Sequence, residues 1–319
     1  MNKTRIPIFF ATDDNYLRYL SVTLLSIEKY ASDAYIYDIK ILTSGLSKEN
    51  EAAIKNLNAP HLQISVVDLE HRVKSIRHKL KSTLRDYYSE SIFYRIFIPS
   101  LFPRIDRALY LDCDIVLCDD IAKLYFTDIG NNILGAVRDE SIKPIPEFSE
   151  YVKKVVGVPE GKYFNSGVLL INADEFRRQR IEEKLLFLLH EYNFSTVAPD
   201  QDYLNFLCKD KVHYFDFGWN KQPNQNADFN KNEIHLIHYN MFNKPWHYDG
   251  VLYEEFFWHF AKESPFYEEI CEEKRSYTDK QRQSDTEAAK KLIGSTIEIL
   301  KKRCSFCHVI GSDFYAVKN

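Results

Sequence analysis

The first seventy residues alternate between two kinds of segment. Short, continuously apolar runs are typical of strands buried in a parallel sheet, whereas apolar residues that recur every three or four positions indicate helices with one buried face. In order, we expect a strand at 6–11, a helix at 16–30, a strand at 37–42, a helix at 47–57 and a strand at 63–67. This alternation predicts a doubly wound α/β sheet, in which a ligand binds beyond the carboxyl ends of the strands.

The same two patterns continue less regularly as far as residue 273. Helices are expected at 86–98, 181–192 and 201–208, and strands at 107–116, 133–137, 168–171, 211–215 and 234–238. The length allows one large α/β domain or two small ones, since ~150 residues per domain is only an average. No internal repeat is visible, and we expect residues 1–273 to form a single domain.

The composition changes from about Lys274. Residues 274–303 contain nine Lys or Arg against four Asp or Glu, with five aliphatic residues interleaved. We expect a polar linker at 274–286 and then a basic amphipathic helix, so that residues 274–319 form a helical extension. Three roles are open for this tail. It could lie on an anionic membrane surface, dock a partner protein, or cap the main domain.

Net charge and cysteine content limit the expected class of partner and the expected cellular compartment. The net charge of −4 gives no reason to expect nucleic acid as a partner. No stretch approaches the ~20 apolar residues that span a membrane, and the first apolar run is too short for a signal peptide. Six sparse, irregularly spaced cysteines are typical of reduced thiols. We therefore expect a cytoplasmic protein, with peripheral contact at the inner face of the membrane left open by the basic tail.

Two carboxylates at the end of the strand at 107–116 are the sharpest local feature. Asp112 and Asp114 would lie ~6–7 Å apart on one face of that strand, where both could hold Mg²⁺ or Mn²⁺. Cys113 would point to the opposite face. The alternative is that the two acids merely close a strand at a solvated edge.

A histidine at the end of another apolar strand adds to this pair. His238 follows the strand at 234–238, and an imidazole beside carboxylates favours Mn²⁺ over Mg²⁺. The alternative is a histidine with a purely structural role. Lys244, beside Pro245 on the following loop, could contact a phosphate group.

Six short motifs occur in one order along the chain. They are Ala11-Thr12-Asp13-Asp14-Asn15-Tyr16, Tyr94-Arg95, Tyr110-Leu111-Asp112-Cys113-Asp114, Tyr163 to Asn172, Asp200 to Asn205, and His238-Tyr239 followed by Lys244-Pro245-Trp246. Together they resemble glycosyltransferase family 8, which includes bacterial lipopolysaccharide galactosyl- and glucosyltransferases and glycogenin. The resemblance extends over residues 5 to about 265.

The resemblance implies a Rossmann-like nucleotide-sugar transferase (GT-A) fold and assigns roles by position. Uracil and ribose would be held by Ala11, Thr12, Asp13, Asn15 and Tyr16, with Tyr16 stacking on the base. The transferred sugar would meet Arg95, Asp112, Asn165, Asp200 and Gln201. Metal ligands would be Asp112, Asp114 and His238, and Lys244 would contact the diphosphate. Cys113, Asn240 and Met241 belong to the same donor-binding positions, and Asp139 matches an acidic residue beside the acceptor.

Each of these motifs also has a plain structural interpretation. Residues 13–15 could be a helix cap, and Arg95 could form an ion pair on a helix surface. Residues 165–167 could be only a turn, and the acids at 200–202 could favour a helix N-terminus through its dipole. Two departures from the family pattern are clear, and one is Cys113, which stands where an apolar residue is more usual between the two acids. The family commonly has glycine between the histidine and the lysine, whereas this chain has Asn240, Met241, Phe242 and Asn243.

The resemblance implies transfer of a hexose from UDP-glucose or UDP-galactose to a saccharide acceptor, with retention at the anomeric carbon. Such acceptors include glycolipids, wall polymers and glycoproteins. Mn²⁺, or Mg²⁺ in its place, would help UDP to leave. A double displacement needs a nucleophile such as Gln201, Asp200 or Asp139, and an amide is a poor one, so front-face attack fits better. Two alternatives are a metal-dependent nucleotidyltransferase and a non-catalytic sugar-nucleotide-binding protein.

Overall fold

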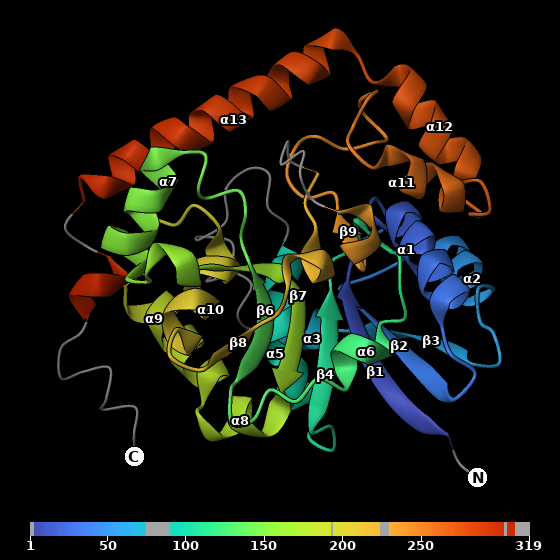
Figure 1. Ribbon diagram of the computed structural model, residues 1–319, viewed down its shortest axis with the longest axis horizontal. Helices are drawn as coiled ribbons and strands as arrows, with labels where there is room; N and C mark the ends of the chain where they lie inside the picture. The colour runs from blue at the N-terminus through green and yellow to red at the C-terminus, as the bar shows by residue number, and fades with distance from the viewer. Residues whose placement is uncertain (1–2, 75–89, 193, 224–229, 303–304, 310–319) are drawn as a thin grey trace.

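A seven-stranded sheet forms the centre of the molecule (Figure 1). The computed structural model describes residues 3–74, 90–192, 194–223, 230–302 and 305–309. The strands, in the order in which they lie side by side, are β3 (Leu62–Asp68), β2 (Tyr35–Thr43), β1 (Thr4–Ala11), β4 (Arg107–Leu111), β7 (Phe164–Asn172), β6 (Leu134–Arg138) and β8 (Val212–Tyr214). The first four are mutually parallel, while β7 runs antiparallel to both β4 and β6. The predicted α/β sheet is therefore confirmed, with one reversed strand in its second half.

Helices cover both faces of this sheet, as the alternating pattern predicts. The longer ones are α1 (Leu17–Tyr30), α2 (Lys48–Lys55), α5 (Tyr94–Leu101), α9 (Ile181–Glu191), α10 (Pro199–Cys208), α11 (Glu254–Ala261), α12 (Tyr267–Ser276) and α13 (Asp279–Leu300). Shorter elements are α3 (Glu70–Lys74), η1 (Glu90–Phe93), α6 (Ala122–Tyr125), α7 (Pro146–Tyr151), η2 (Val152–Val156), η3 (Glu160–Lys162), α8 (Ala173–Arg178), η4 (Phe217–Asn220), η5 (Lys231–Glu233) and η6 (Phe306–Val309). Of the helix expected at 86–98, residues 86–89 lie outside the described part of the chain.

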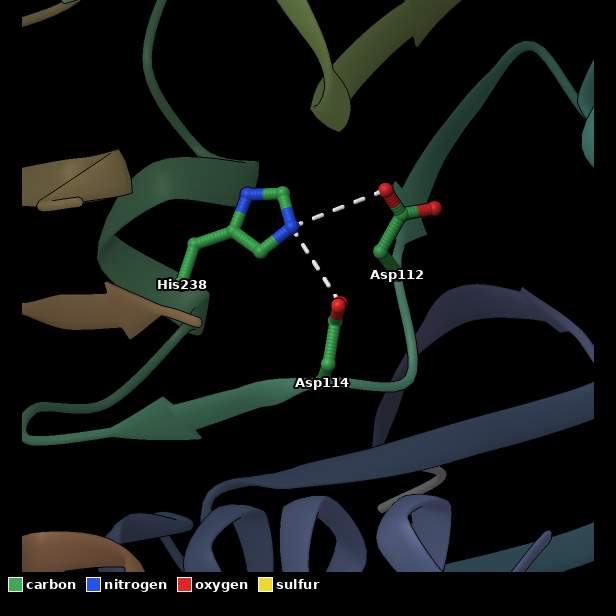
Figure 2. Close-up of side chains that lie close together, drawn as sticks. All are labelled: Asp112, Asp114 and His238. Carbon is green, nitrogen blue, oxygen red and sulfur yellow. Dashed lines mark ion pairs between the residues drawn. The ribbon is translucent and has the colours of Figure 1, made fainter. Parts of the chain in front are cut away.

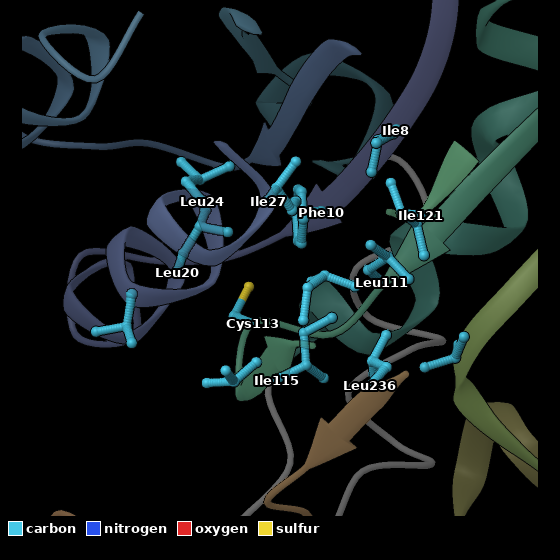
Figure 3. Packing of buried hydrophobic residues seen from close by; sticks show 14 of the residues in the cluster. Ile8, Phe10, Leu20, Leu24, Ile27, Leu111, Cys113, Ile115, Ile121 and Leu236 are labelled. Carbon is cyan, nitrogen blue, oxygen red and sulfur yellow. The ribbon is translucent and has the colours of Figure 1, made fainter. Parts of the chain in front are cut away.

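Two hydrophobic clusters lie on opposite faces of the sheet because side chains alternate along each strand. Ile8 and Phe10 of β1 pack against Leu20 and Leu24 of α1 in the first cluster (Figure 3), whereas Phe9 belongs to the second. Cys113 is buried in the first cluster, and its Sγ donates to the Ala11 carbonyl at 3.3 Å. The side chain of Cys113 is therefore held among the apolar residues beside α1.

The single strand expected at 107–116 is wrong, because the chain bends between Asp112 and Asp114. β4 ends at Leu111 in the central sheet, and β5 (Ile115–Leu117) pairs antiparallel with β9 (Leu236–His238) in a separate two-stranded sheet. Thr23 of α1 stabilises the bend, since its hydroxyl donates to the carbonyls of Cys113 and Ile115 at 3.0 and 2.7 Å. The two acids therefore converge through a bend rather than through strand alternation.

The polar linker expected at 274–286 is also wrong, because these residues are mostly helical. Position 274 lies within α12, and α13 begins at Asp279 after a capping box formed by Thr278 and Gln281. The capping box satisfies backbone N–H groups at the start of a helix, so a polar, exposed segment can still be helical. Among the described residues, no helix combines the length and apolar character that a membrane span requires.

Candidate active site

Asp112, Asp114 and His238 meet where the central sheet and the small sheet adjoin (Figure 2). The β5–β9 register places His238 opposite Ile115, one residue after Asp114. The His238 Nε2 atom lies 3.2 Å from Asp114 Oδ1 and 3.7 Å from Asp112 Oδ2. One ligand atom from each residue lies within 4.8 Å of the other two. Side chains from two distant segments of the chain therefore form one candidate metal site.

Two neighbours hold this cluster in shape. Asn220 accepts a hydrogen bond from His238 Nδ1 at 2.9 Å, which fixes the ring and leaves Nε2 directed at the acids. Asn220 itself is positioned by a bridge between Lys221 and Ile237. Gly167 of β7 leaves the space, because a Cβ atom there would clash with His238 Cε1 and lie 2.5 Å from Asp112 Oδ2. The donor set and the oriented imidazole both suit a divalent cation.

Arg95 of α5 fixes the position of Asp112. Its side chain is only 4% exposed, and it lies 3.0 Å from Asp112 Oδ1 and 3.3 Å from Asp200 Oδ2. Burial would lower the pKa of Arg95, but the two carboxylates outweigh it and raise that pKa. Tyr110 donates to the same Asp112 Oδ1 atom at 3.0 Å. Arg95 is thus an internal charge partner, and the alternative of a surface ion pair is wrong.

Asp114 divides its two oxygens between His238 and Lys244. Oδ1 faces the imidazole, and Oδ2 is ion-paired with the Lys244 ammonium group. Burial would raise the pKa of Asp114, but Lys244 and His238 hold it well below its usual range. The Lys244 ammonium lies 5.9 Å from the centre of the Tyr16 ring. This places a buried cation between the acid cluster and the aromatic residue expected to stack on the base.

A hydrogen-bonded network of polar side chains continues behind the cluster. Gln201 donates to Asp139 Oδ2 at 2.9 Å and accepts from the Ser166 backbone N–H at 2.9 Å. Asn165 accepts from Asn220 Nδ2 at 2.9 Å, and Ser166 Oγ donates to Asp200 Oδ2 at the same distance. All of these residues are buried. The structure therefore brings the three candidate catalytic residues, Gln201, Asp200 and Asp139, into one network with Asn165.

Burial raises the pKa of Asp200, although Arg95 opposes the effect. The 165–167 segment is part of β7 rather than a turn. Asp202, at the N-terminal end of α10, accepts hydrogen bonds from the Val197 and Ala198 N–H groups at 3.0 Å each. The acids at 200–202 thus divide their roles, since Asp202 organises the helix start and Asp200 faces Arg95.

A cavity of about 540 Å³ opens beside the acid cluster. Its wall includes Ala11, Thr12, Asp13, Tyr16, Arg95, Asp112, Cys113, Asp114, Met241 and Lys244, as well as Ser91, Ile92, Tyr110, Phe242, His247 and Asp285. Most residues assigned to donor binding therefore surround one space. Asn15 is exposed, and the residues assigned to donor binding that do not line this cavity are Asn15, Asn165, Asp200, Gln201, His238 and Asn240. Their assignment stays a prediction.

The polar residues at 13–15 have partly structural roles. Asp13 Oδ1 accepts from the Tyr16 N–H at 3.0 Å, which is the interaction of a helix cap. Asp14 accepts from the Ser47 N–H at 3.0 Å and from Asn50 Nδ2 at 2.7 Å, so it joins this loop to α2. Asp13 nonetheless lines the cavity, which is compatible with both interpretations.

Several residues of the site had no signal in the sequence. Asn220, Lys221 and Gln222 lie in a run of polar residues that reads as an ordinary loop. Gln222 donates to Asp139 Oδ1 at 3.2 Å, and the fully buried Lys221 pairs with Glu140 at 2.9 Å. His247 and Asp285 line the cavity from segments that the motifs do not reach.

Comparison with known proteins agrees with this geometry. The sequence model described as "Glycosyl transferase family 8" matches residues 7–250. The lipopolysaccharide glucosyltransferase WaaO of Escherichia coli is 27% identical over 252 residues, which cover 76% of this chain and 73% of that protein.

Solved structures give the same result. The galactosyltransferase LgtC, determined with donor and acceptor sugar analogs, is 29% identical with a TM-score of 0.67, covering 82% of this chain and 96% of that one. The bifunctional glycosyltransferase WbbM is 23% identical with a TM-score of 0.73, covering 86% of this chain and 53% of that one. At that identity WbbM supports only the GT-A fold. With its ordered motifs, its fold and a match over most of its length, the chain belongs to glycosyltransferase family 8.

Proposed function

We propose that this glycosyltransferase moves glucose or galactose from a UDP-sugar to a saccharide acceptor, with retention, and that it depends on Mn²⁺. The observation that carries the proposal is the Asp112–Asp114–His238 cluster beside a cavity that also contains Lys244 and Tyr16. LgtC is described as a galactosyltransferase and WaaO as a glucosyltransferase, which supports a hexose donor without choosing between the two sugars.

The donor would lie with its charged part over the acid cluster. Asp112, Asp114 and His238 would hold the ion, and Mn²⁺ when bound supplies positive charge that stabilises a departing diphosphate. Lys244 is positioned to contribute a second positive charge to the same phosphate groups. The hydrogen bond between His238 Nδ1 and Asn220 would leave Nε2 available to the ion. Tyr16 would cover the base, and Arg95 would keep Asp112 oriented.

The hydrogen bonds of Gln201 support front-face attack over a double displacement. Both ends of its amide are engaged, with Ser166 and with Asp139, so the amide oxygen is not free to attack carbon. Asp200 is likewise held by Arg95 and Ser166. We therefore assign Gln201, Asp200 and Asp139 to positioning the sugar and the acceptor, while the leaving phosphate accepts the acceptor's proton.

Donor hydrolysis tests the proposal without an identified acceptor. UDP release from UDP-glucose and UDP-galactose is measured with Mn²⁺, with Mg²⁺ and with a chelator, for the wild type, Asp112→Ala and His238→Ala. We expect metal-dependent release by the wild type for one of the two sugars and a loss of at least about a hundredfold in both variants. Full activity in both variants would contradict the metal assignment.

Matched variants control for the loss of one charged or imidazole side chain. Asp210 and His259 are exposed and lie outside the cavity, so Asp210→Ala and His259→Ala should keep wild-type activity. Two other results would favour the alternatives. Pyrophosphate release from UTP would indicate nucleotidyl transfer, and UDP binding without any turnover would indicate a non-catalytic binder.

The cytoplasmic setting and membrane contact through the tail stay predictions. Lys290, Lys291, Lys301 and Lys302 are exposed, whereas Leu292 and Ile299 are buried against the rest of the molecule. Any contact with an anionic membrane would therefore be mainly electrostatic. Arg303, which was counted in the basic tail, lies outside the described residues.

A further inference from the structure

The C-terminal helix α13 reaches the cavity that is assigned to the donor. It crosses one side of the molecule from α12 to α7, above the sheet edge at which β4 ends (Figure 1). Asp285 of this helix lines the cavity together with His247. The family match ends at residue 250, so the helix adds a wall that the matched region does not supply.

Asp285 is held by two tyrosines. Its Oδ2 atom accepts from the hydroxyl of Tyr248 at 2.7 Å and from that of Tyr277 at 2.6 Å. Arg282, one turn earlier, lies over both rings, with its Cζ at 5.0 and 5.6 Å from their centres. Within the described part of the chain, the other oxygen, Oδ1, makes no hydrogen bond. A fixed carboxylate thus keeps one acceptor oxygen unused at the cavity wall.

The two helices that carry this wall are fastened at both ends. At one end, Glu273 of α12 pairs with His247 at 2.9 Å and with Arg18 at 3.3 Å, and the His247 ring stacks on Tyr277 at 3.9 Å. At the other end, Leu292 and Ile299 are buried in the second hydrophobic cluster, where α13 contacts α7 and η2. The helix is therefore an integral part of the pocket.

The neighbours of Asp285 indicate which part of a bound donor this residue would contact. It is tied to Tyr248 and, through Tyr277, to His247, on the wall that continues from Lys244. Arg95 and Asp112, which are assigned to the hexose, belong to another set of elements, α5 and β4. A carboxylate is repelled by phosphate but accepts hydrogen bonds from neighbouring hydroxyl groups.

We propose that Asp285 is a specificity-determining residue that accepts a hydrogen bond from a ribose hydroxyl of the bound nucleotide. The inference rests on the proposed function, because it requires a nucleoside diphosphate in this cavity. It assigns part of nucleotide recognition to a helix beyond the family match. It also gives a reason for the two tyrosines that hold the Asp285 carboxylate and for the arginine that packs on their rings.

The test compares three nucleotides by titration calorimetry in the presence of Mn²⁺. These are UDP, 2′-deoxy-UDP and 3′-deoxy-UDP, each titrated into the wild type, Asp285→Ala and Asp285→Asn. Both substitutions remove the charged acceptor, and Asn keeps the size of the side chain. We expect either variant to bind UDP roughly ten- to a hundredfold more weakly. The loss should disappear for the deoxynucleotide that lacks the contacted hydroxyl.

Glu287→Ala is the matched control, because Glu287 carries the same charge on the same helix, is exposed and does not line the cavity. It should bind all three nucleotides as the wild type does. Unchanged UDP affinity in Asp285→Asn, or an equal loss for all three nucleotides, would overturn the assignment of Asp285 alone. A wild type that does not bind UDP with Mn²⁺ would overturn the proposed function as well.

Discussion

At the scale of single residues, Gly167 sets the space between Asp112 and His238. The absence of a side chain there is a steric requirement, since its φ is not in the left-handed region and only the neighbouring atoms exclude a Cβ. The same strand carries Asn165, which links the cluster to Asn220 and Asp139. A single methyl group at 167 would therefore displace both a metal ligand and the network behind it.

Gly167→Ala should weaken Mn²⁺ binding by roughly ten- to a hundredfold, because it displaces His238 and Asp112 from each other. The affinity can be measured by the loss of the free Mn²⁺ signal in electron paramagnetic resonance. Gly161→Ala is the control, since a Cβ there meets nothing within 4 Å. Equal affinity in the two variants would show that the cluster adapts to the methyl group.

Met241 lies in the loop between His238 and Lys244, where the resemblance leads us to expect a glycine. It adopts a left-handed φ of 62° and is 47% exposed. This conformation costs an L-residue roughly 1–2 kcal/mol relative to glycine. The loop thus keeps a backbone shape that suits glycine, although the sequence lacks one.

Met241→Gly should leave the free energy of unfolding unchanged or raise it by up to about 1 kcal/mol, since relief of strain offsets the added flexibility of the unfolded chain. Asn243→Gly should lower it by about 0.5–1 kcal/mol, because residue 243 has no positive φ to relieve. Urea denaturation of both variants measures the difference. A larger loss in Met241→Gly than in Asn243→Gly would argue against strain at Met241.

The three members of the candidate metal site could be predicted from the sequence, whereas the residues that orient them could not. Asp112, Asp114 and His238 each end an apolar run, and such polar residues stand out against their surroundings. Asn220 lies in a polar stretch in which no residue stands out from its neighbours. Only the folded structure, in which Lys221 forms a bridge with Ile237 of β9, shows that Asn220 forms a hydrogen bond with His238. Asp285 is hidden for a similar reason, because it is one of many charges on an exposed helix.

At the scale of elements, the bend between β4 and β5 organises the site. A continuous apolar pattern over 107–116 gives no signal for it, because both short strands are buried and equally apolar. The bend arises from tertiary contacts, namely the pairing of β5 with β9 and the hydroxyl of Thr23. Most of the helices and strands could thus be predicted from the sequence. The passage of the chain from the central sheet into the two-stranded sheet could not.

Asp202 ties three elements together at the start of α10. Its carboxylate accepts from Tyr151 of α7 at 2.7 Å, from Tyr163 before β7 at 2.6 Å, and from two backbone N–H groups. Burial raises the pKa of Asp202 to about 6, although these hydrogen bonds lower it. Between about pH 4 and about pH 6 the folded chain therefore keeps a proton that the unfolded chain releases.

The stability of the folded state should consequently fall as pH rises through this window, with Asp202 contributing about 2–3 kcal/mol of the decrease. Asp202→Asn should remove that part of the slope, because the amide stays neutral at every pH and its oxygen can still accept a hydrogen bond from a tyrosine hydroxyl. Urea denaturation at a series of pH values measures it. Asp210→Asn, at an exposed site, is the control, and an unchanged slope in Asp202→Asn would contradict the assignment.

At the scale of the whole molecule, the cavity gathers residues from nearly the full length of the chain, from Ala11 to Asp285. They come from β1, β4 and the segments that follow these strands, from the region around α5, from the loop after β9 and from the C-terminal helix. A ligand that fills this space contacts parts that are joined only in the folded state. Its binding free energy should therefore appear directly as resistance to unfolding.

UDP and Mn²⁺ together should stabilise the protein by about 2.7 kcal/mol at a hundredfold excess over Kd, with a matching rise in Tm. UDP alone or Mn²⁺ alone should raise Tm by a smaller amount. The ion offsets the negative charge of both the phosphates and the acid cluster, so each ligand should bind more weakly without the other. Differential scanning fluorimetry measures this, with Asp112→Ala as the variant that should lose the effect. An equal rise in Tm when UDP is added with a chelator would contradict the proposal that UDP and Mn²⁺ bind at one shared site.

The contribution of helix α13 to the cavity wall also matters for the design of selective inhibitors. Compounds that imitate only the nucleotide sugar address the part of the cavity formed by residues 7–250, the range that the family model matches. An extension toward Asp285, Tyr277 and Arg282 would meet a surface encoded outside that shared region. Chemical series directed at this corner could thus separate the present enzyme from relatives that lack an equivalent helix.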